Sequence, residues 1–305
     1  MEKTTMLQYL VFICMLIVEY YPSVLSLEPL RTRILLPGHV YIYKHSDDVY
    51  NQLIDLKDFK FLINPPRCNH SLLLLVIVTT KWNHYERRKW IRETWTAPWE
   101  WTRVLFFVGE PNSFKASDFQ KIRNESDLYG DIVMGNFVDA YVNMTYKHTM
   151  GLKWVAHHCP NAKYILKLDD DVAVDPEEFR EFLVQRLSPW GARRLIACNC
   201  YADESFKSKY KPIVMDYCGT FCHGWAILYS QDAVHELLRV VQRMPYHWID
   251  DIHITKTCAD VLEIPRIPLC QLERRWRQLF KTNTLYFYEK WLRNHNEAWL
   301  FRLLH

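Results

Sequence analysis

The chain has 305 residues, of which 49% are hydrophobic and 24% are charged, so it can bury a sizeable core as one large α/β domain or two small ones. Its formal net charge is +3 with both signs interspersed, and the sequence lacks the basic stripe that nucleic-acid-binding proteins carry. The composition indicates a globular protein and argues against nucleic acid as a partner.

The N-terminal segment, residues 1–27, is apolar enough to enter a membrane. Its uninterrupted apolar stretch covers only 10–18 before Glu19, which is short for a spanning helix of about 20 residues. With Glu19 near the interface, the segment can span a thin bilayer as a signal anchor. A cleaved signal peptide ending near Ser26 is the alternative, since Lys3 supplies a charged start. Both interpretations place the rest of the chain in the secretory lumen.

The cysteines and the glycosylation sequons agree with a lumenal location. Eight of the nine cysteines follow the N-terminal segment, an even number that suits disulfides in an oxidising compartment. They are Cys68, Cys159, Cys198, Cys200, Cys218, Cys222, Cys258 and Cys270. The cysteines and histidine of 198–200 and 218–223 could alternatively bind zinc, but disulfide formation is the commoner role of lumenal cysteines. N-x-S/T sequons stand at Asn69, Asn124 and Asn143; the last falls in a predicted helix, where a buried structural amide is the alternative.

The chain then reads as a lead-in followed by alternating strands and helices. Residues 28–66 show no clear period and are expected to form a stem, whereas the apolar run Leu72–Val78 predicts a strand buried on both faces. The alternation beyond it predicts βαβ units and a mainly parallel sheet. Further strands are expected at 103–110, 131–137, 164–168, 194–201 and 224–230, and helices at 86–95, 118–130, 140–158, 176–187, 231–241 and 250–262. The tail, 274–305, is expected to pack on the core as amphipathic helices.

Three adjacent carboxylates, Asp169, Asp170 and Asp171, directly follow the predicted strand at 164–168. Like charges side by side need water or a cation, so a solvated turn and a metal site are both possible readings. Ligands of open α/β sheets bind beyond the carboxyl ends of the strands, which favours the metal. Mn²⁺ or Mg²⁺ prefers such oxygen ligands and can bridge the phosphates of a leaving nucleoside diphosphate. The chain has only eight glycines and no glycine-rich phosphate loop, so a cation is the simpler way for it to hold phosphate.

A second acidic pair, Asp250 and Asp251, opens the predicted helix at 250–262. One interpretation is stabilisation of the helix N-terminus by capping and by the helix dipole. The other is a general base that removes a proton from an attacking hydroxyl group. The pair alone does not decide between them.

Five segments resemble the beta-1,3-galactosyltransferase family, the inverting hexosyltransferases that include the beta-1,3-N-acetylglucosaminyltransferases and Fringe. The segment "RKWIRETW" is similar to the family's R-x-x-I-R-x-T-W signature, and "KYILKLDDDVAV" to its K-x-D-D-D-V segment. The other three are "YGDIVMGNFVDAYVNMTYKH", "CHGWAILYS" and "IDDIHIT". All five stand in the family's order between residues 72 and 262.

The resemblance implies a GT-A-type nucleotide-sugar-binding fold over residues 67–305, a UDP-sugar donor, Mn²⁺ or Mg²⁺, and a single-pass type II enzyme of the Golgi membrane with its catalytic domain in the lumen. By motif position, Asp171 is the main metal ligand, with Asp169 as a metal or donor contact, and Asp251 is the catalytic base. The remaining implied donor-binding residues are Arg88, Arg92, Asp139 and Asp170. For the two arginines, salt bridges along an amphipathic helix are the alternative.

The sequence also departs from the family pattern. Asn136 stands where the family has an acid, Ala173 where it has a bulkier residue, Asp250 for Glu, His253 for an aromatic residue and Lys256 near the usual glycine. The family's later metal-binding histidine has no clear counterpart; His295 is the late internal candidate, and a surface histidine is the alternative reading. The predicted function is transfer of galactose or an N-acetylhexosamine from a UDP-sugar to a glycan on a glycoprotein or glycolipid, in a β1,3 link. Because of the departures, a catalytically silent lumenal chaperone or scaffold is the alternative.

Overall fold

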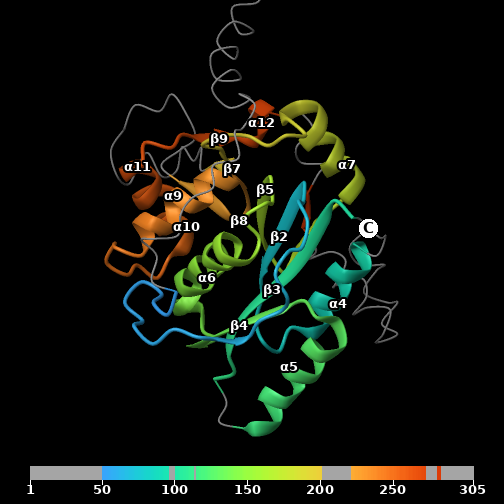
Figure 1. Cartoon of the computed structure of the whole chain (residues 1–305), viewed down its shortest axis with the longest axis vertical. Coiled ribbons are helices and arrows are strands. Elements are labelled where there is room, and N and C mark those ends of the chain that lie inside the picture. Colours follow the sequence, from blue (N-terminus) through green and yellow to red (C-terminus); the bar gives the residue numbers. More distant parts are fainter. Residues whose placement is uncertain (1–49, 96–99, 113–114, 201–220, 273–279, 283–305) are drawn as a thin grey trace, which may run out of the picture.

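The computed structural model describes residues 50–95, 100–112, 115–200, 221–272 and 280–282 (Figure 1). These form one mixed sheet of eight strands, in the order β1-β4-β3-β2-β5-β8-β7-β9, with helices on both faces. The N-terminal segment, the first part of the expected stem and most of the tail lie outside the described residues. In the described part of the tail, residues 280–282 form a strand, so the prediction of a helix is wrong there, because these residues pair with residues 172–174. Within the described ranges, no helix has both the length and the apolarity needed to cross a bilayer.

The elements follow the alternation expected from the sequence. The strands of the large sheet are β1 (Phe61–Ile63), β2 (Leu74–Thr79), β3 (Thr102–Glu110), β4 (Ile132–Val138), β5 (Tyr164–Asp169), β7 (Ile196–Cys200), β8 (Cys222–Ser230) and β9 (Arg266–Pro268). The helices are α4 (Tyr85–Thr94), α5 (Ala116–Tyr129), α6 (Met144–His158), α7 (Pro176–Glu181), α9 (Gln231–Val241), α10 (Asp250–Ile252), α11 (Ala259–Val261) and α12 (Leu269–Leu272). A 3₁₀ turn, η1 (Tyr141–Asn143), precedes α6, and π-helical turns η2 (Phe182–Leu187) and η3 (His253–Cys258) follow α7 and α10. A small second sheet pairs β6 (Val172–Val174) with β10 (Phe280–Thr282).

The centre of the large sheet is parallel, as the βαβ alternation predicts, and its flanks are not. Strands β4, β3, β2 and β5 run parallel to one another. Strand β8 is antiparallel to both β5 and β7, and β1 is antiparallel to β4. The expected parallel centre is confirmed, but the sheet as a whole is mixed. Because β8 runs backwards, its first residues lie beside the end of β5, with Ala226 paired to Leu168.

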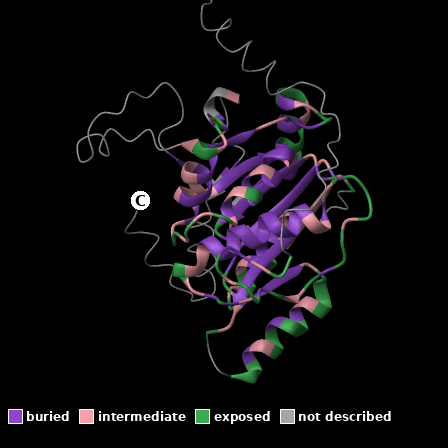
Figure 2. Cartoon of the chain, turned by 60° about the vertical axis from the view of Figure 1, so that its left-hand side comes forward, coloured by how far each residue is buried: buried purple, intermediate pink, exposed green. Residues whose placement is uncertain are grey.

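The sheet is buried on both faces, because consecutive side chains of a strand point in opposite directions. In β2, Leu75 and Ile77 belong to one apolar cluster, while Leu74, Val76 and Val78 belong to the other. Helices α6 and α9 cover the first cluster, and α4, α5 and α7 the second (Figure 2). Every residue of β2 is buried, as the apolar run predicts. Burial of each Leu, Ile or Val side chain of β2 stabilises the fold by about 1.5–3 kcal/mol.

Part of the segment expected to be a stem packs on this domain. Leu53 and Phe59 are fully buried, and β1 pairs with the edge strand β4. Asn136 of β4 holds the incoming chain with both ends of its amide: its Nδ2 donates to the Asp58 carbonyl at 2.8 Å, and its Oδ1 accepts from the Lys60 N–H at 2.7 Å. An acid at position 136 would lack that donor, so this departure from the family pattern has a structural use.

Two disulfides between described residues join segments that are distant in sequence. Cys68, just before β2, is bonded to Cys159 at the end of α6, and Cys198 of β7 to Cys222 of β8. The second bond agrees with the disulfide interpretation for Cys198 and Cys222 over the zinc alternative; Cys218 lies outside the described residues. Cys258 is buried with a free thiol.

Candidate active site

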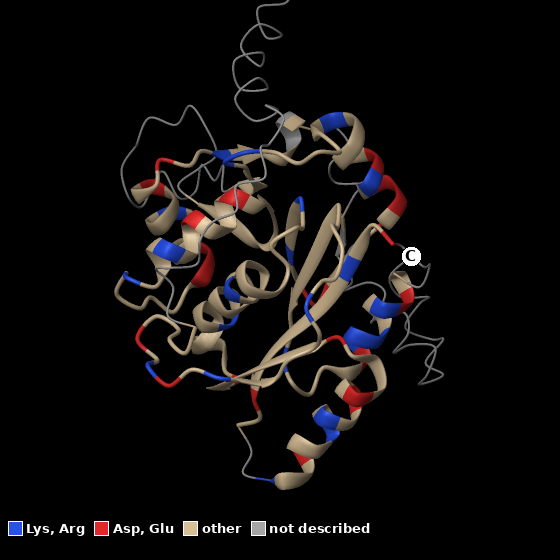
Figure 3. Ribbon diagram, in the orientation of Figure 1, with Lys and Arg blue, Asp and Glu red and all other residues tan. Residues whose placement is uncertain are grey.

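Asp169 is the last residue of β5, so Asp169 and Asp171 lie at the carboxyl edge of the parallel strands, where the sequence places its metal site. Acidic and basic residues are interspersed over the elements of the domain (Figure 3). The Oδ1 atom of Asp169 accepts hydrogen bonds from Thr79 Oγ1 at 2.8 Å and from Lys167 Nζ at 2.6 Å. Its side chain is 35% exposed. Asp171 is exposed in the turn, and partial desolvation, followed by the charges of Asp169 and Asp170, raises the pKa of its carboxyl group. This electrostatic conflict is of the kind that a bound cation relieves.

Asp170 has a different role from its two neighbours. It is buried, and its carboxylate accepts from Thr80 Oγ1, His84 Nδ1 and Arg87 Nη1, each at 2.6 Å. Burial alone would raise its pKa, but the hydrogen bonds from His84, Thr80 and Arg87 outweigh it and lower the pKa to about 2. Asp170 therefore fastens the turn after β5 to the loop after β2 and to α4.

The donor set suits a cation that substrate and water also coordinate. Among the described residues, no three histidine, cysteine or acidic side chains gather in a group that could enclose a metal ion. Asp169 and Asp171 provide hard oxygen ligands, and Mg²⁺ or Mn²⁺ is often held by one or two carboxylates together with substrate phosphates. These residues fit such a cation as a shared ligand set.

The acidic pair at the start of α10 lies close to this edge. Asp250 is buried; its Oδ2 is 2.8 Å from His148 Nδ1 and 3.9 Å from Lys167 Nζ. Burial opposes ionisation, but Lys167 and His148 lower the pKa of Asp250 well below its usual range. The N-cap of α10 is Ile249, with no side-chain capping bond, so classical N-capping does not account for the pair.

Asp251, the predicted base, is half-buried beside Asp250. Its side chain lies against Gly224 at the start of β8, and its Oδ1 accepts from the Ile252 N–H at 2.8 Å. Partial burial and the neighbouring Asp250 charge raise the pKa of Asp251. A carboxylate with a raised pKa is the better proton acceptor, so the opposite pKa shifts of Asp250 and Asp251 suit an anchoring acid beside a general base. The role of Asp251 as the catalytic base stays a prediction.

Lys167 joins the two acidic clusters. It is the lysine of the K-x-D-D-D-V segment, but no role was predicted for it from the sequence. It lies in the middle of β5 with 1% of its surface exposed, and its Nζ also donates to the Gly224 carbonyl. The available signal was a lysine inside the otherwise apolar strand "YILKL". A buried lysine needs acidic partners. The acids that act on Lys167 are Asp169, Asp250 and Asp251, of which Asp169 and Asp251 are predicted site residues.

Asp139 lies at the same edge, but its carboxylate is already engaged. It accepts from Lys147 Nζ at 2.7 Å, the Trp82 N–H at 2.9 Å and the Gly109 N–H at 3.2 Å. Asp139 and Lys147 are both 3% exposed, so the ion pair is shielded from water. The contacts position the loop after β2 against the end of β3; donor binding by Asp139 stays a prediction.

Arg88 is fully buried at the interface of α4 and α5. Its Nε and Nη2 form a bidentate pair with Glu125, and its remaining hydrogen bonds go to the carbonyls of Lys81 and Trp82. This arrangement is the salt bridge considered as the alternative for Arg88. Donor binding by this side chain stays a prediction.

Arg92 lies one helical turn further along α4. It pairs with Asp131 through Nε at 2.8 Å and with Glu125 through Nη2 at 2.8 Å, and its guanidinium stacks 3.9 Å from the centre of the Tyr129 ring. Its Nη1 is buried and has no hydrogen-bond partner within the part of the chain that the structure describes. Arg92 thus braces α4 against α5 and β4, and a donor contact stays a prediction.

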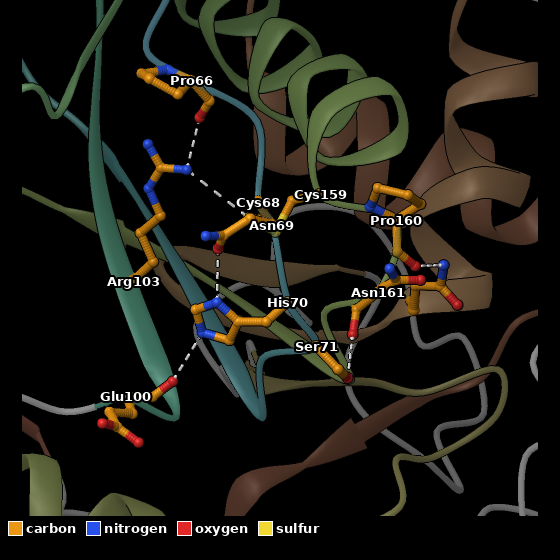
Figure 4. The surroundings of a disulfide bond; sticks show 11 residues. Pro66, Cys68, Asn69, His70, Ser71, Glu100, Arg103, Cys159, Pro160 and Asn161 are labelled. Carbon is orange, nitrogen blue, oxygen red and sulfur yellow. Dashed lines mark hydrogen bonds between the residues drawn. A yellow bond between two sulfur atoms is a disulfide. The ribbon is translucent and has the colours of Figure 1, made fainter.

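The three sequons differ in accessibility. Asn69 is exposed directly after Cys68, and its side-chain oxygen accepts from His70 Nδ1 (Figure 4). Asn124 is exposed on α5. Asn143 is half-buried in η1, just before α6, and its Nδ2 donates to the Val138 carbonyl at 2.8 Å. Asn69 and Asn124 therefore present accessible amides, whereas Asn143 has the structural contact considered as its alternative.

Comparison with known proteins identifies the family. A family model described as galactosyltransferase matches residues 86–270, more than half of the chain and the part that holds both acidic clusters. The chain belongs to the galactosyltransferase family. This confirms the family expected from the five sequence segments, and with it the class of hexosyltransferases.

Individual relatives agree. Human beta-1,3-galactosyltransferase 5 is 25% identical over 275 residues, which cover 84% of this chain and 80% of that protein. The UDP-GlcNAc:betaGal beta-1,3-N-acetylglucosaminyltransferase 7 of Rattus norvegicus is 37% identical over 138 residues, or 42% of this chain and 35% of that protein. Beta-1,3-galactosyltransferase 4 of the same organism is 39% identical over 133 residues, or 41% and 35%. The matches to these two rat proteins span about a third of their length.

Solved glycosyltransferase structures show distant likeness. A mannosyltransferase from Pyrobaculum calidifontis in complex with GDP-Man and Mn²⁺ covers 68% of this chain and 57% of its own, with a TM-score of 0.40 and 13% identity. The galactosyltransferase LgtC in complex with donor and acceptor sugar analogues covers 64% and 72%, with a TM-score of 0.36 and 11% identity.

Proposed function

We propose that the chain is a metal-dependent inverting glycosyltransferase of GT-A type that moves galactose or an N-acetylhexosamine from a UDP-sugar to a glycan acceptor, in a β1,3 link. The observation that carries the proposal is the meeting of two acidic clusters of different character at one edge of the sheet. Asp169 and Asp171 supply oxygens for a cation, and Asp251 supplies a base. Lys167 contacts Asp169 and lies 3.9 Å from Asp250, the neighbour of that base.

On the donor side, Asp169 and Asp171 would hold Mn²⁺ or Mg²⁺, which neutralises the diphosphate of the leaving UDP. Asp170 does not share this task, because its oxygens are engaged by Thr80, His84 and Arg87. It keeps the turn after β5 in place. The fixed turn presents the carboxylates on either side of Asp170 without a rearrangement when the donor binds.

On the acceptor side, Asp251 would take the proton from the attacking hydroxyl. The oxygen then bonds to the anomeric carbon as the bond to UDP breaks, and attack from the opposite side inverts the configuration. Tyr141 and Trp248, both exposed with ring centres 5.9 Å apart, lie beside this edge. Trp248 is three residues before Asp251, so the rings are suitably placed to support the apolar face of an acceptor sugar.

For the location, we propose the Golgi membrane, with the N-terminal segment as a single type II anchor and the catalytic domain in the lumen. The two disulfides and the exposed amides of Asn69 and Asn124 support a lumenal domain. Endoglycosidase treatment of chain expressed in a secretory system should shift its mobility. No shift would count against this placement.

Two substitutions in the full-length chain test the chemistry. Asp171→Ala should abolish Mn²⁺-dependent UDP binding and transfer together, because the diphosphate loses its counter-charge. Asp251→Asn keeps the size of the side chain but cannot accept a proton, so transfer should fall by roughly 10²–10⁴-fold while UDP binding survives. UDP affinity is measured by calorimetry with Mn²⁺ and with EDTA, and transfer by UDP release over donor and acceptor panels.

The outcomes separate the candidate functions. Near-normal transfer by Asp251→Asn would refute Asp251 as the base, and equal UDP affinity in EDTA would refute the metal site. If the wild-type chain transfers sugar from no donor, the catalytically silent chaperone or scaffold becomes the better description.

A further inference from the structure

Lys167 is a buried charge that the chemistry described so far does not use. Removing an ammonium group from water costs several kcal/mol unless good partners compensate. An apolar residue at this position of β5 would avoid that cost, as Ile165 and Leu166 do. The partners of Lys167 therefore indicate what the charge is for.

The ammonium group contacts three separate elements. Its Nζ is 2.6 Å from Asp169 Oδ1 at the end of β5 and 3.9 Å from Asp250 Oδ2 at the start of α10. It also donates to the carbonyl of Gly224 at the start of β8. One side chain thus touches the metal-facing cluster, the strand beside it and the segment that carries the base.

Two of these contacts extend to Asp251. The Asp251 side chain packs against Gly224, whose carbonyl Lys167 holds. Asp250, the preceding residue, is fixed from the other side by His148, whose Nε2 is 3.3 Å from the Tyr229 hydroxyl. The position of Asp251 therefore depends on a chain of buried contacts that begins at Asp169.

We propose that Lys167 is a positioning residue that couples the carboxylates facing the donor's cation to the segment carrying the base, so that the two halves of the site keep one relative arrangement. This inference rests on the proposed function. A side chain that orients a metal ligand typically changes metal affinity by 10–100-fold when it is removed. Coupling predicts one further effect. A substitution of Asp250 should change Mn²⁺-dependent UDP affinity when Lys167 is present, and should leave that affinity unchanged when Lys167 is absent.

A double-mutant cycle in the full-length chain tests this demand. Mn²⁺-dependent UDP affinity is measured by calorimetry for wild type, Lys167→Met, Asp250→Asn and the double variant. Asp232→Asn, alone and with Lys167→Met, is the matched control. Asp232 and Asp250 are both 8% exposed, but Asp232 binds Ser230 Oγ and the Arg194 N–H, away from the site. Circular dichroism and unfolding midpoints confirm that each variant is folded at the assay temperature.

We expect Lys167→Met to weaken Mn²⁺-dependent UDP binding by roughly 10–100-fold. Asp250→Asn should weaken it measurably in wild type and have no further effect in the Lys167→Met background. A role of Lys167 in fold stability alone predicts that Asp250→Asn and Asp232→Asn behave alike, each having the same effect in both backgrounds. That result, or unchanged affinity in folded Lys167→Met, overturns the proposal. If Lys167→Met does not fold, Lys167→Arg and Lys167→Gln replace it in the same cycle.

The cycle also keeps the two proposals apart. Coupled UDP binding in a chain that transfers no sugar would leave the coupling intact and refute the transferase. Additive binding in a chain that transfers sugar would refute the coupling alone. A wild-type chain that binds no UDP with Mn²⁺ would refute both.

Discussion

The free energy of unfolding should fall as the pH is lowered from 8 to 5, and His253 should account for a defined part of the loss. His253 is 1% exposed, and its Nε2 has no hydrogen-bond partner among the described residues. Burial, then the charges of His247 and His148, lower its pKa to about 4, and Asp250 only partly opposes them. The family has an aromatic residue here, so His253→Phe is the natural perturbation.

The sign follows from proton linkage. The pKa of His253 is lower in the folded chain than the ordinary 6.5, so the unfolded chain binds the proton more readily. The contribution of His253 to the free energy of unfolding is present above pH 6.5 and is lost as the pH falls toward 4. With these two pKa values, acidification from pH 8 to 5 costs about 2 kcal/mol, and acidification to pH 6 about 0.8 kcal/mol.

Urea unfolding at several pH values measures the effect. His253→Phe should flatten the curve of unfolding free energy against pH by about 2 kcal/mol between pH 8 and 5. His158, whose pKa burial and the charge of His157 lower to about 4, provides an independent comparison at the end of α6. His158→Phe should remove the contribution of His158 to the pH dependence of the unfolding free energy, and the double variant should remove the contributions of both histidines. A wild-type slope in His253→Phe would refute this account of the buried imidazole.

Substitutions at three other places test the site and its support. Gly224→Ala should be tolerated, because an added Cβ would lie 3.4 Å from Asp251, whereas Gly224→Val should displace that carboxyl and lower kcat more than UDP affinity in the UDP-release assay. Asp139→Ala should cost about 3–5 kcal/mol in urea unfolding, since it strands a buried lysine; a loss below 1 kcal/mol would contradict a buried ion pair there. Replacing Cys68 and Cys159 with serine should cost about 4–5 kcal/mol, because their bond closes a loop with a sequence separation of 91; an unchanged unfolding midpoint would contradict this.

The centre of the fold could be predicted because its signals are local. The apolar run Leu72–Val78 identified a strand buried on both faces, and alternation with helices identified the parallel order that β2, β3 and β5 adopt. The direction of β8 could not be predicted, because an apolar strand has the same pattern whichever way it runs. The short strands β1 and β9 were missed because three residues carry no measurable period.

The site was predicted as far as charge and position in the strand allowed. The carboxylates at the end of β5 could be proposed as a site because acids at the end of a buried strand are conspicuous. Their different contacts could not be predicted, because Asp170 is engaged by Thr80, His84 and Arg87, more than 80 residues away in the sequence. No role was predicted for Lys167, the lysine of the K-x-D-D-D-V segment, for a related reason: its contact with Asp250 forms only when residues 83 apart in sequence meet in the fold.

The place of β2 between β3 and β5 has a consequence for synthesis. Leu74 pairs with Tyr164, so β2 leaves the ribosome 90 residues before its second neighbour and meanwhile carries an unpaired apolar edge. Cys159 emerges just before β5, and its partner Cys68 lies just before β2. The Cys68–Cys159 bond can therefore form only when synthesis has almost reached β5, the last strand of the parallel centre. Formation of this bond during synthesis should then coincide with the pairing of β5 to the open edge of β2.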